Sequence, residues 1–431
     1  MKYFLPALAL TLLSVSCANK DTTNKGAITQ ELAPTLAKQS SLPDFSPSSL
    51  PSSLPKNIIM IIGDGMGPAY TTAYRYFSDN PNTKLIEKTV FDRNLVGSSS
   101  TYPARMSGYV TDSAASATAL STGIKTYNNA VGVDVNKKEI QTVLEWAKLQ
   151  GKKTGVVVTS QINHATPASY LAHNKHRYNY NEIADSYIDD GIKADLYFGG
   201  GWKYFIRDDR NLVNEFKQAG FHYIDNYEGL NHLPPEKPVL GLFANSGLPW
   251  ALDNTNSHKL KIMTKAALTK LENTQGFFLL VEGSKVDWAG HSNDIAAAMA
   301  EMDDLAKTVE YIETYVTEHP DTLVVMTADH STGGFTIGAN GKYQWHPEVL
   351  RSMTMSADTI ADKIETIKPN SVNTRPLFNF ELNKEEIAQL SEVKENALKD
   401  LVAYNSLSVE QKKEKYQPAN TQRIIQKSVC D

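Results

Sequence analysis

The stretch that decides the fold is Asn57-Ile-Ile-Met-Ile-Ile-Gly-Asp-Gly-Met-Gly67. Its apolar run ends at Ile62, and a glycine-rich turn that carries Asp64 follows at once. A short continuous apolar run that stops at a glycine turn is typical of a strand buried on both faces, as the strands of parallel sheets are. The stretch therefore predicts a buried parallel strand and its exit turn.

The same pattern recurs along the chain. Three further short apolar runs, each followed by polar residues, lie at residues 154–159, 276–281 and 322–327. Segments with apolar residues at helical spacing lie between them, at residues 142–150, 258–272 and 296–317. Alternating strands and helices predict an α/β domain over residues 56–349, with a mostly parallel central sheet and helices on both faces. Residues 350–415 are charged and helix-prone and have no apolar strand runs, which predicts a helical insertion or cap and a C-terminal segment over residues 350–431.

The N-terminus has the features of an export signal. Lys2 is followed by an apolar run over residues 3–15, which is too short to span a bilayer. We therefore expect residues 1–17 to be a signal peptide, with either plain cleavage or lipidation at Cys17, and the protein to reach the periplasm or cell envelope. Residues 18–55 are rich in Ser, Thr and Pro and are expected to form a flexible tether. With only Cys17 and Cys430 present, no disulfide framework is expected.

The charge of the chain argues against nucleic acid as a specific partner. Lys and Arg number 43 and Asp and Glu 48, so the formal net charge is -5. No block of basic residues interleaved with aromatic residues occurs.

Polar side chains follow the end of each predicted strand. They are Asp64 after the first, His164 and Thr166 after the second, Glu282 after the third, and Asp329 and His330 after the fourth. Ligands of open α/β sheets bind beyond the carboxyl ends of the strands, so these side chains should converge. Carboxylates packed so closely repel one another unless divalent cations offset the repulsion. The pattern predicts a site for several metal ions.

The segment after the third strand adds Asp287 and His291, at i and i+4 on a helical turn, where both can bind one ion. Mixed Asp and His ligands suit zinc, whereas the all-oxygen set of Asp64, Thr166 and Glu282 suits magnesium.

The candidate nucleophile is Ser113, in Val110-Thr-Asp-Ser-Ala-Ala-Ser-Ala-Thr-Ala-Leu120. The small residues after Asp112 indicate that a helix begins at the serine, and a helix N-terminus binds phosphate and favours an alkoxide. A zinc ion at the hydroxyl would lower its pKa further, so that no histidine base is required. Taken singly, Ser113 could be a helix-packing residue and Asp64 a turn cap, and their joint placement favours the site.

Five motifs in this order resemble those of the alkaline phosphatase family and cover residues 56–346: Gly63-Asp-Gly-Met-Gly67, Thr111-Asp-Ser-Ala114, His164-Ala-Thr-Pro167, Glu282-Gly-Ser-Lys-Val-Asp287 with His291, and Thr327-Ala-Asp-His330 with Thr332-Gly-Gly-Phe335. The resemblance implies two Zn²⁺ and one Mg²⁺. Asp64, Asp329 and His330 would hold one zinc, Asp287 and His291 the other, and Asp64, Thr166 and Glu282 the magnesium. Arg177 resembles the family's phosphate-clamping arginine.

The activity implied is hydrolysis of phosphate monoesters. Ser113 would attack phosphorus to give a phosphoserine, which water then hydrolyses, while Arg177 stabilises the equatorial oxygens. Two alternatives remain: a related hydrolase of phosphodiesters or sulfate esters, and a catalytically impaired metal- or phosphate-binding lipoprotein. Relatives are often dimers, so a homodimer is also expected by analogy.

The sequence departs from the family pattern in two ways. His164 and Trp288 stand where some members carry Asp and Lys, and we expect them to tune magnesium affinity and phosphate release, with His164 able to bind a transition metal. Relatives also supply a zinc ligand from a His-Thr-Gly-like segment near the C-terminus, whereas no histidine follows His346 here. Either His346 takes that place or the chain is shortened before the segment, which would leave the zinc at Asp287 and His291 under-coordinated.

Overall fold

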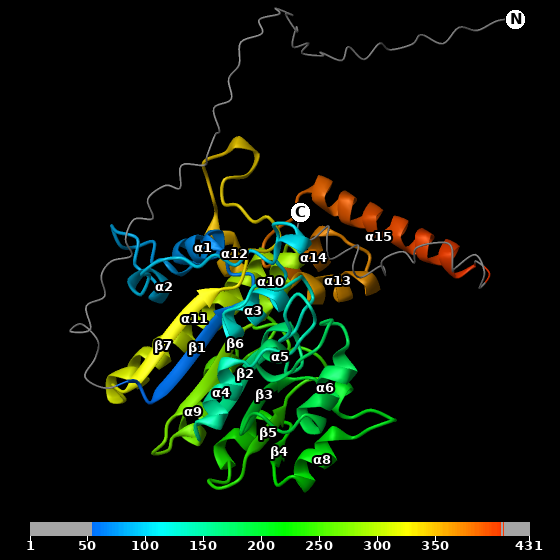
Figure 1. Cartoon of the computed structure of the whole chain (residues 1–431). Helices are drawn as coiled ribbons and strands as arrows, with labels where there is room; N and C mark the ends of the chain where they lie inside the picture. The colour runs from blue at the N-terminus through cyan, green and yellow to red at the C-terminus, as the bar shows by residue number, and fades with distance from the viewer. Residues whose placement is uncertain (1–53, 407, 409–431) are drawn as a thin grey trace, which may run out of the picture. The chain divides into compact units, whose positions relative to one another are not determined.

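The core of the structure is a sheet of parallel strands (Figure 1). The structure is a computed structural model that describes residues 54–406 and 408. Its seven strands are ordered β4-β5-β3-β2-β6-β1-β7, and every pair of neighbours is parallel. The strands are β1 Asn57–Gly63, β2 Lys153–Gln161, β3 Leu196–Gly200, β4 His222–Ile224, β5 Val239–Leu242, β6 Phe277–Gly283 and β7 Thr322–Ala328.

Helices join the strands and continue past the last one. The α-helices are α1 Pro68–Ser78, α2 Val90–Arg93, α3 Ser113–Thr122, α4 Val143–Leu149, α5 Ala165–Leu171, α6 Tyr180–Asp189, α7 Trp202–Phe205, α8 Leu212–Gln218, α9 Lys259–Leu271, α10 Lys285–His291, α11 Ile295–Glu318, α12 Pro347–Ser352, α13 Ala357–Thr366, α14 Ser371–Phe378 and α15 Lys384–Asn405. Short 3₁₀ helices lie at Arg105–Ser107, Tyr227–His232 and Ala339–Gly341.

Two hydrophobic cores lie on opposite faces of the sheet. Successive side chains of a strand point to opposite faces, so in β1 Ile61 belongs to one core and Ile62 to the other. The first core adds residues of α1, α9 and α11, and the second adds residues of α3 to α6 and α8. The predicted α/β class, with helices on both faces of a parallel sheet, is confirmed.

The predicted helical segment after residue 350 contains α13, α14 and α15. Their small apolar core is built around Ile360, Ile364 and Phe378. Hydrogen bonds tie α13 to the α/β part: the Ser356 amide and hydroxyl both donate to Asp253, and Trp250 Nε1 donates to Asp358 Oδ2 at 2.6 Å.

Several sequence predictions lie outside the described residues. These are the signal peptide with Cys17, the tether as far as residue 53, and the C-terminal residues from 409 onward. Among residues 54–406 and 408, no helix is both long enough and apolar enough to cross a membrane.

Candidate functional site

The strand-end residues meet because their strands are neighbours. β1 lies between β6 and β7, and Gly63 is in register with Gly283 and with Ala328. Asp64 follows Gly63, Glu282 precedes Gly283, and Asp329 follows Ala328. All three carboxylates therefore lie together at the carboxyl ends of the strands. All three residues are fully buried.

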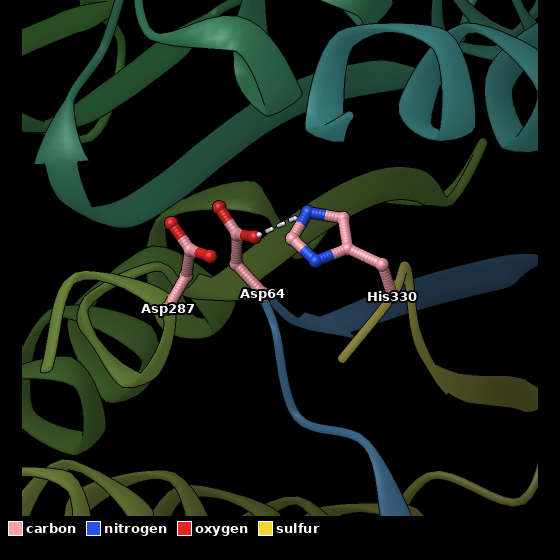
Figure 2. A group of neighbouring side chains, drawn as sticks. All are labelled: Asp64, Asp287 and His330. Atoms are coloured by element: carbon pink, nitrogen blue, oxygen red, sulfur yellow. Dashed lines mark ion pairs between the residues drawn. The ribbon is translucent and has the colours of Figure 1, made fainter. Parts of the chain in front are cut away.

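Asp64, Asp287 and His330 form one group of converging ligand atoms (Figure 2). One ligand atom from each residue lies within 4.8 Å of the others. His330 Nε2 is 3.5 Å from Asp64 Oδ1 and 3.4 Å from Asp329 Oδ2. Three chain segments therefore direct two carboxylates and an imidazole into one space, with Asp329 beside them.

Asp64 also belongs to a second group, with His164 and Glu282, in which the ligand atoms again lie within 4.8 Å of one another. Thr166 follows on the first turn of α5. Several buried atoms of this region form no hydrogen bond with any described residue: Asp64 Oδ2, His164 Nδ1, Thr166 Oγ1, both carboxylate oxygens of Glu282, and Asp329 Oδ2. Buried polar atoms nearly always have partners, so this concentration of unpaired atoms marks a place for a ligand.

Burial and mutual repulsion disfavour the charges of these carboxylates. Burial raises the pKa of Asp64 well above its usual value, and the charges of Asp287, Asp329 and Glu282 raise it further, whereas Arg177 lowers it. Burial raises the pKa of Glu282 to about 8 and also raises that of Asp329. A bound cation would favour the ionised forms instead, because an opposite charge at short range lowers the pKa of a carboxyl group.

Ser113 is the first residue of α3, as predicted from the small residues that follow it. Asp112 caps the helix by accepting a hydrogen bond from the Ala115 amide at 3.0 Å. Ser113 Oγ lies 3.0 Å from His330 Nε2 and 3.4 Å from Asp64 Oδ1. The hydroxyl therefore combines the positive end of a ten-residue helix with contact to the first group of ligand atoms.

Arg177 is buried next to Asp112 and His164. Its Nη1 donates to Asp112 Oδ2 at 3.1 Å, and its Nη2 donates to His164 Nε2 at 3.3 Å. Burial opposes the charge of Arg177, but Asp112 raises the pKa of the guanidinium. Burial and the charge of Arg177 both lower the pKa of His164 well below its usual value. A neutral imidazole and a permanent cation thus lie side by side.

The close packing of the site requires glycine at residue 65. The φ angle of Gly65 is +67°, and a Cβ atom there would lie 2.5 Å from Thr332 Oγ1 and 2.9 Å from Asp287 Cα. The glycine-rich turn after β1 therefore lets the backbone pass directly against α10 and the loop after β7.

Thr332 is a site residue for which the sequence indicated a motif but no role. Its hydroxyl donates to Asp287 Oδ1 at 2.5 Å and lies 3.1 Å from His330 Nδ1. The Ser331 carbonyl is also near His330 Nδ1, at 3.2 Å. The Thr332 hydroxyl oxygen and the Ser331 carbonyl oxygen can each accept a hydrogen bond from Nδ1–H, and this tautomer would leave the lone pair of Nε2 directed at Ser113 and Asp64.

The two remaining predicted residues, His291 and His346, are exposed: His291 contacts the first group through Asp287, and His346 lies outside both groups. His291 Nε2 is 3.4 Å from Asp287 Oδ1, so the i, i+4 pair is in contact, but the His291 side chain is 72% exposed. His346 forms a surface hydrogen bond with Glu348 at 2.9 Å and belongs to neither group of ligands found among the described residues.

The comparisons with known proteins agree with this geometry. The family model described as alkaline phosphatase matches residues 55–422. The chain is 50% identical to alkaline phosphatase 3 of Bacillus subtilis over 315 residues, which are 72% of this chain and 68% of that protein.

Solved structures are also similar. The crystal structure of a cold-active alkaline phosphatase from a psychrophilic Shewanella species has 46% identity and a TM-score of 0.76, over 86% of this chain and 87% of that chain. A histidine-to-glutamate variant of the alkaline phosphatase from the Antarctic bacterium TAB5, with Mg bound in its M3 site, has 30% identity and a TM-score of 0.60, over 68% of this chain and 85% of that one.

Fold and site therefore define a phosphatase with a candidate metal centre. The chain belongs to the alkaline phosphatase family.

Proposed function

We propose that this phosphatase hydrolyses phosphate monoesters through a phosphoserine on Ser113, and that it requires two zinc ions and one magnesium ion. The observation that carries the proposal is the set of buried, unpaired carboxylate oxygens of Asp64, Glu282 and Asp329 beside the Ser113 hydroxyl. Such a set is unfavourable in an empty protein and favourable around cations.

The donor atoms suit the proposed metals. Asp64, Asp329 and His330 supply carboxylates and an imidazole for one zinc, and Asp287 and His291 supply a carboxylate and an imidazole for the other. Asp64, Thr166 and Glu282 supply only oxygen, which suits magnesium, and an imidazole nitrogen of His164 lies within 4.8 Å of ligand atoms of Asp64 and Glu282. When bound, these cations lower the pKa of the serine hydroxyl, stabilise the charge on the departing oxygen and activate water.

The residues of the chain then bind and orient the substrate. Ser113 Oγ loses its proton to solvent and attacks phosphorus, so that an Oγ–P bond forms while the ester P–O bond breaks, and the departing alkoxide takes up a proton from water and leaves as the alcohol. A water molecule then attacks phosphorus, the Oγ–P bond breaks, and inorganic phosphate departs while Ser113 Oγ is protonated again. Arg177 donates two parallel hydrogen bonds to the non-bridging oxygens, and Asp112 and His164 hold its guanidinium in place. The amides at the start of α3 add a positive potential at the phosphate.

A Ser–His–acid mechanism without metal is less consistent with these contacts. In such a triad the acid binds the imidazole nitrogen that faces away from the serine. Here His330 Nε2 itself faces Ser113, Asp64 and Asp329, while Nδ1 faces Thr332 and Ser331. Several ligands that crowd around one nitrogen fit a shared cation better than proton transfer to a serine.

The test compares a phosphate monoester with a diester and a sulfate ester, with zinc and magnesium present and then with chelator. We expect monoester turnover that chelation abolishes and that Ser113→Ala lowers by at least about 10³-fold. Ser116→Ala is the matched control, since Ser116 is a buried serine of the same helix whose hydroxyl donates to the Asp112 carbonyl. Preferential turnover of diester or sulfate ester would support a related hydrolase, and metal binding without turnover would support the impaired binding protein.

We also propose that the protein is exported to the periplasm or cell envelope, either free or attached through a lipidated Cys17, and that it forms a homodimer. The N-terminal signal pattern supports export. Globomycin-sensitive labelling with a fatty acid would distinguish lipidation from plain cleavage.

A further inference from the structure

Tyr178 is an exposed aromatic residue next to the candidate phosphate-binding arginine. Arg177 is 8% exposed, whereas Tyr178 is 62% exposed. The Cζ atom of Arg177 lies 5.6 Å from the centroid of the Tyr178 ring. The ring therefore packs against the guanidinium and also faces solvent, at the boundary between the buried site and the outside.

Two more tyrosines continue from this ring. The ring centroids of Tyr178 and Tyr180 are 6.0 Å apart in a T-shaped arrangement, and those of Tyr180 and Tyr204 are 5.0 Å apart. We call Tyr178, Tyr180 and Tyr204 the tyrosine strip. Lys203 Nζ lies 4.8 Å from the centroid of the Tyr204 ring. The strip thus runs from Arg177 to a second cation.

Internal packing accounts for the inner part of the strip, whereas the outer ring, Tyr178, stays mostly exposed although its centroid lies 5.4 Å from that of the His176 ring. Tyr180 and Tyr204 are partly buried and contact each other. Tyr178 leaves most of its surface in water, so its burial contributes little to stability. Single exposed aromatic residues are common on proteins. This one differs because it contacts the residue that the proposed mechanism uses to hold phosphate.

We propose that the tyrosine strip binds the organic part of the substrate, and that it favours phosphate monoesters with a planar aromatic ring, in particular nucleoside 5′-monophosphates. The inference rests on the proposed function, because it requires the phosphate to sit between Ser113 and Arg177. With the phosphate fixed there, the base of a nucleotide extends outward and can stack on Tyr178. Aromatic side chains bind bases through their faces with little dependence on base identity.

Adenosine 5′-monophosphate and ribose 5-phosphate form a matched pair for the test, because they share the same ester linkage and differ in the base. We expect Tyr178→Ala to lower kcat/KM for adenosine 5′-monophosphate roughly tenfold, mainly through a higher KM. We expect the same substitution to change kcat/KM for ribose 5-phosphate by less than about twofold. Tyr178→Phe keeps the ring and should retain the wild-type preference. Inhibition by inorganic phosphate should be the same in all three proteins, because Arg177 remains in place.

An equal loss on both substrates would overturn the inference and would make Tyr178 a support for Arg177 only. Unchanged kinetics on both substrates would also overturn it, since the strip would then contact neither. Both results leave monoester hydrolysis by the wild-type protein intact. If the wild-type protein hydrolyses neither substrate, the proposed function itself fails and the inference fails with it.

Discussion

Two groups of buried acids in this molecule differ in what surrounds them. The strand-end acids are Asp64, Glu282 and Asp329, and the helix acids are Asp294, Glu301 and Asp304 on and just before α11. All six are at most 5% exposed. The strand-end acids leave four solvent-inaccessible carboxylate oxygens without a hydrogen bond from any described residue, whereas no solvent-inaccessible oxygen of the helix acids is left in this way.

The helix acids are satisfied by the protein itself. Asp294 accepts from the Ala297 and Ala357 amides, and so caps α11 and joins it to α13. Asp304 accepts hydrogen bonds from two amides in the first turn of α9, those of Leu260 and Lys261. Glu301 accepts from the Ala251 amide at 2.9 Å and lies near the buried Lys285.

The comparison shows that burial of an acid does not by itself indicate a metal site. A buried carboxylate whose buried oxygens all accept hydrogen bonds from the protein is a structural residue, for which a helix cap is one common role. The strand-end acids converge, and each keeps at least one buried oxygen without a hydrogen bond, although Asp329 Oδ1 accepts from the Gly65 and His330 amides. Those free oxygens need a partner that the polypeptide does not supply. Matched substitutions in the two groups test this distinction.

The largest difference should appear in activity. Asp64→Asn removes the carboxylate shared by both groups of ligands and should lower kcat/KM for a monoester by roughly 10³-fold or more. Asp304→Asn, the matched substitution among the helix acids, should lower it by less than about threefold. Steady-state kinetics with saturating zinc and magnesium measure both. Comparable losses in the two variants would mean that the two groups do not differ in function.

The free energy of unfolding should change with pH through the titration of the Asp304 carboxyl group. Burial raises its pKa from 3.8 to about 7. The folded protein favours the protonated form of Asp304. The stabilisation that results is complete below the pKa that Asp304 has in the unfolded chain, and it is lost as pH rises through about 7. Asp304→Asn removes the titration, so the stability of the variant relative to wild type should rise by about 2–4 kcal/mol between pH 4 and pH 8.

Denaturant unfolding of both proteins at the two pH values checks this expectation. The difference between the proteins isolates Asp304 from the other groups that titrate. A difference that does not change with pH would show that Asp304 stays ionised throughout the range.

The smallest effect should come from Thr332. Thr332→Val keeps the shape of the side chain but removes the hydroxyl that contacts Asp287 and His330. We expect zinc affinity to fall about tenfold, since such supporting hydrogen bonds orient ligands. Competition with a chromophoric chelator measures the affinity without turnover. Thr332→Ser should restore it, and equal affinity in Thr332→Val and wild type would assign Thr332 a packing role only.

The sequence predicted the long strands and missed the short ones. β1, β2, β6 and β7 follow from continuous apolar runs that end in polar residues. β3 contains two glycines, β4 has three residues and β5 has four, so none of them has an apolar run long enough to recognise. These strands form the edge of the sheet on the side away from β1 and β7, and their absence from the prediction did not affect the site.

The positions of the site residues in the fold explain which of them the sequence predicted. Asp64, Glu282 and Asp329 lie at strand ends, so the topology alone brings them together. Thr332 and Tyr178 contact the site through loop conformations, which depend on packing between segments far apart in the sequence. The sequence also did not distinguish Asp304 from an exposed acid on a helix, because its burial and its role at the start of α9 are tertiary features.

The count of divalent ions per chain tests the central claim most directly. After dialysis against buffer with zinc and magnesium, elemental analysis of the wild-type protein should give two zinc ions and one magnesium ion, and Asp304→Asn should give the same. Glu282→Gln should lose the magnesium. A wild-type protein that retains less than one ion per chain, or a Glu282→Gln protein with the wild-type content, would contradict the account.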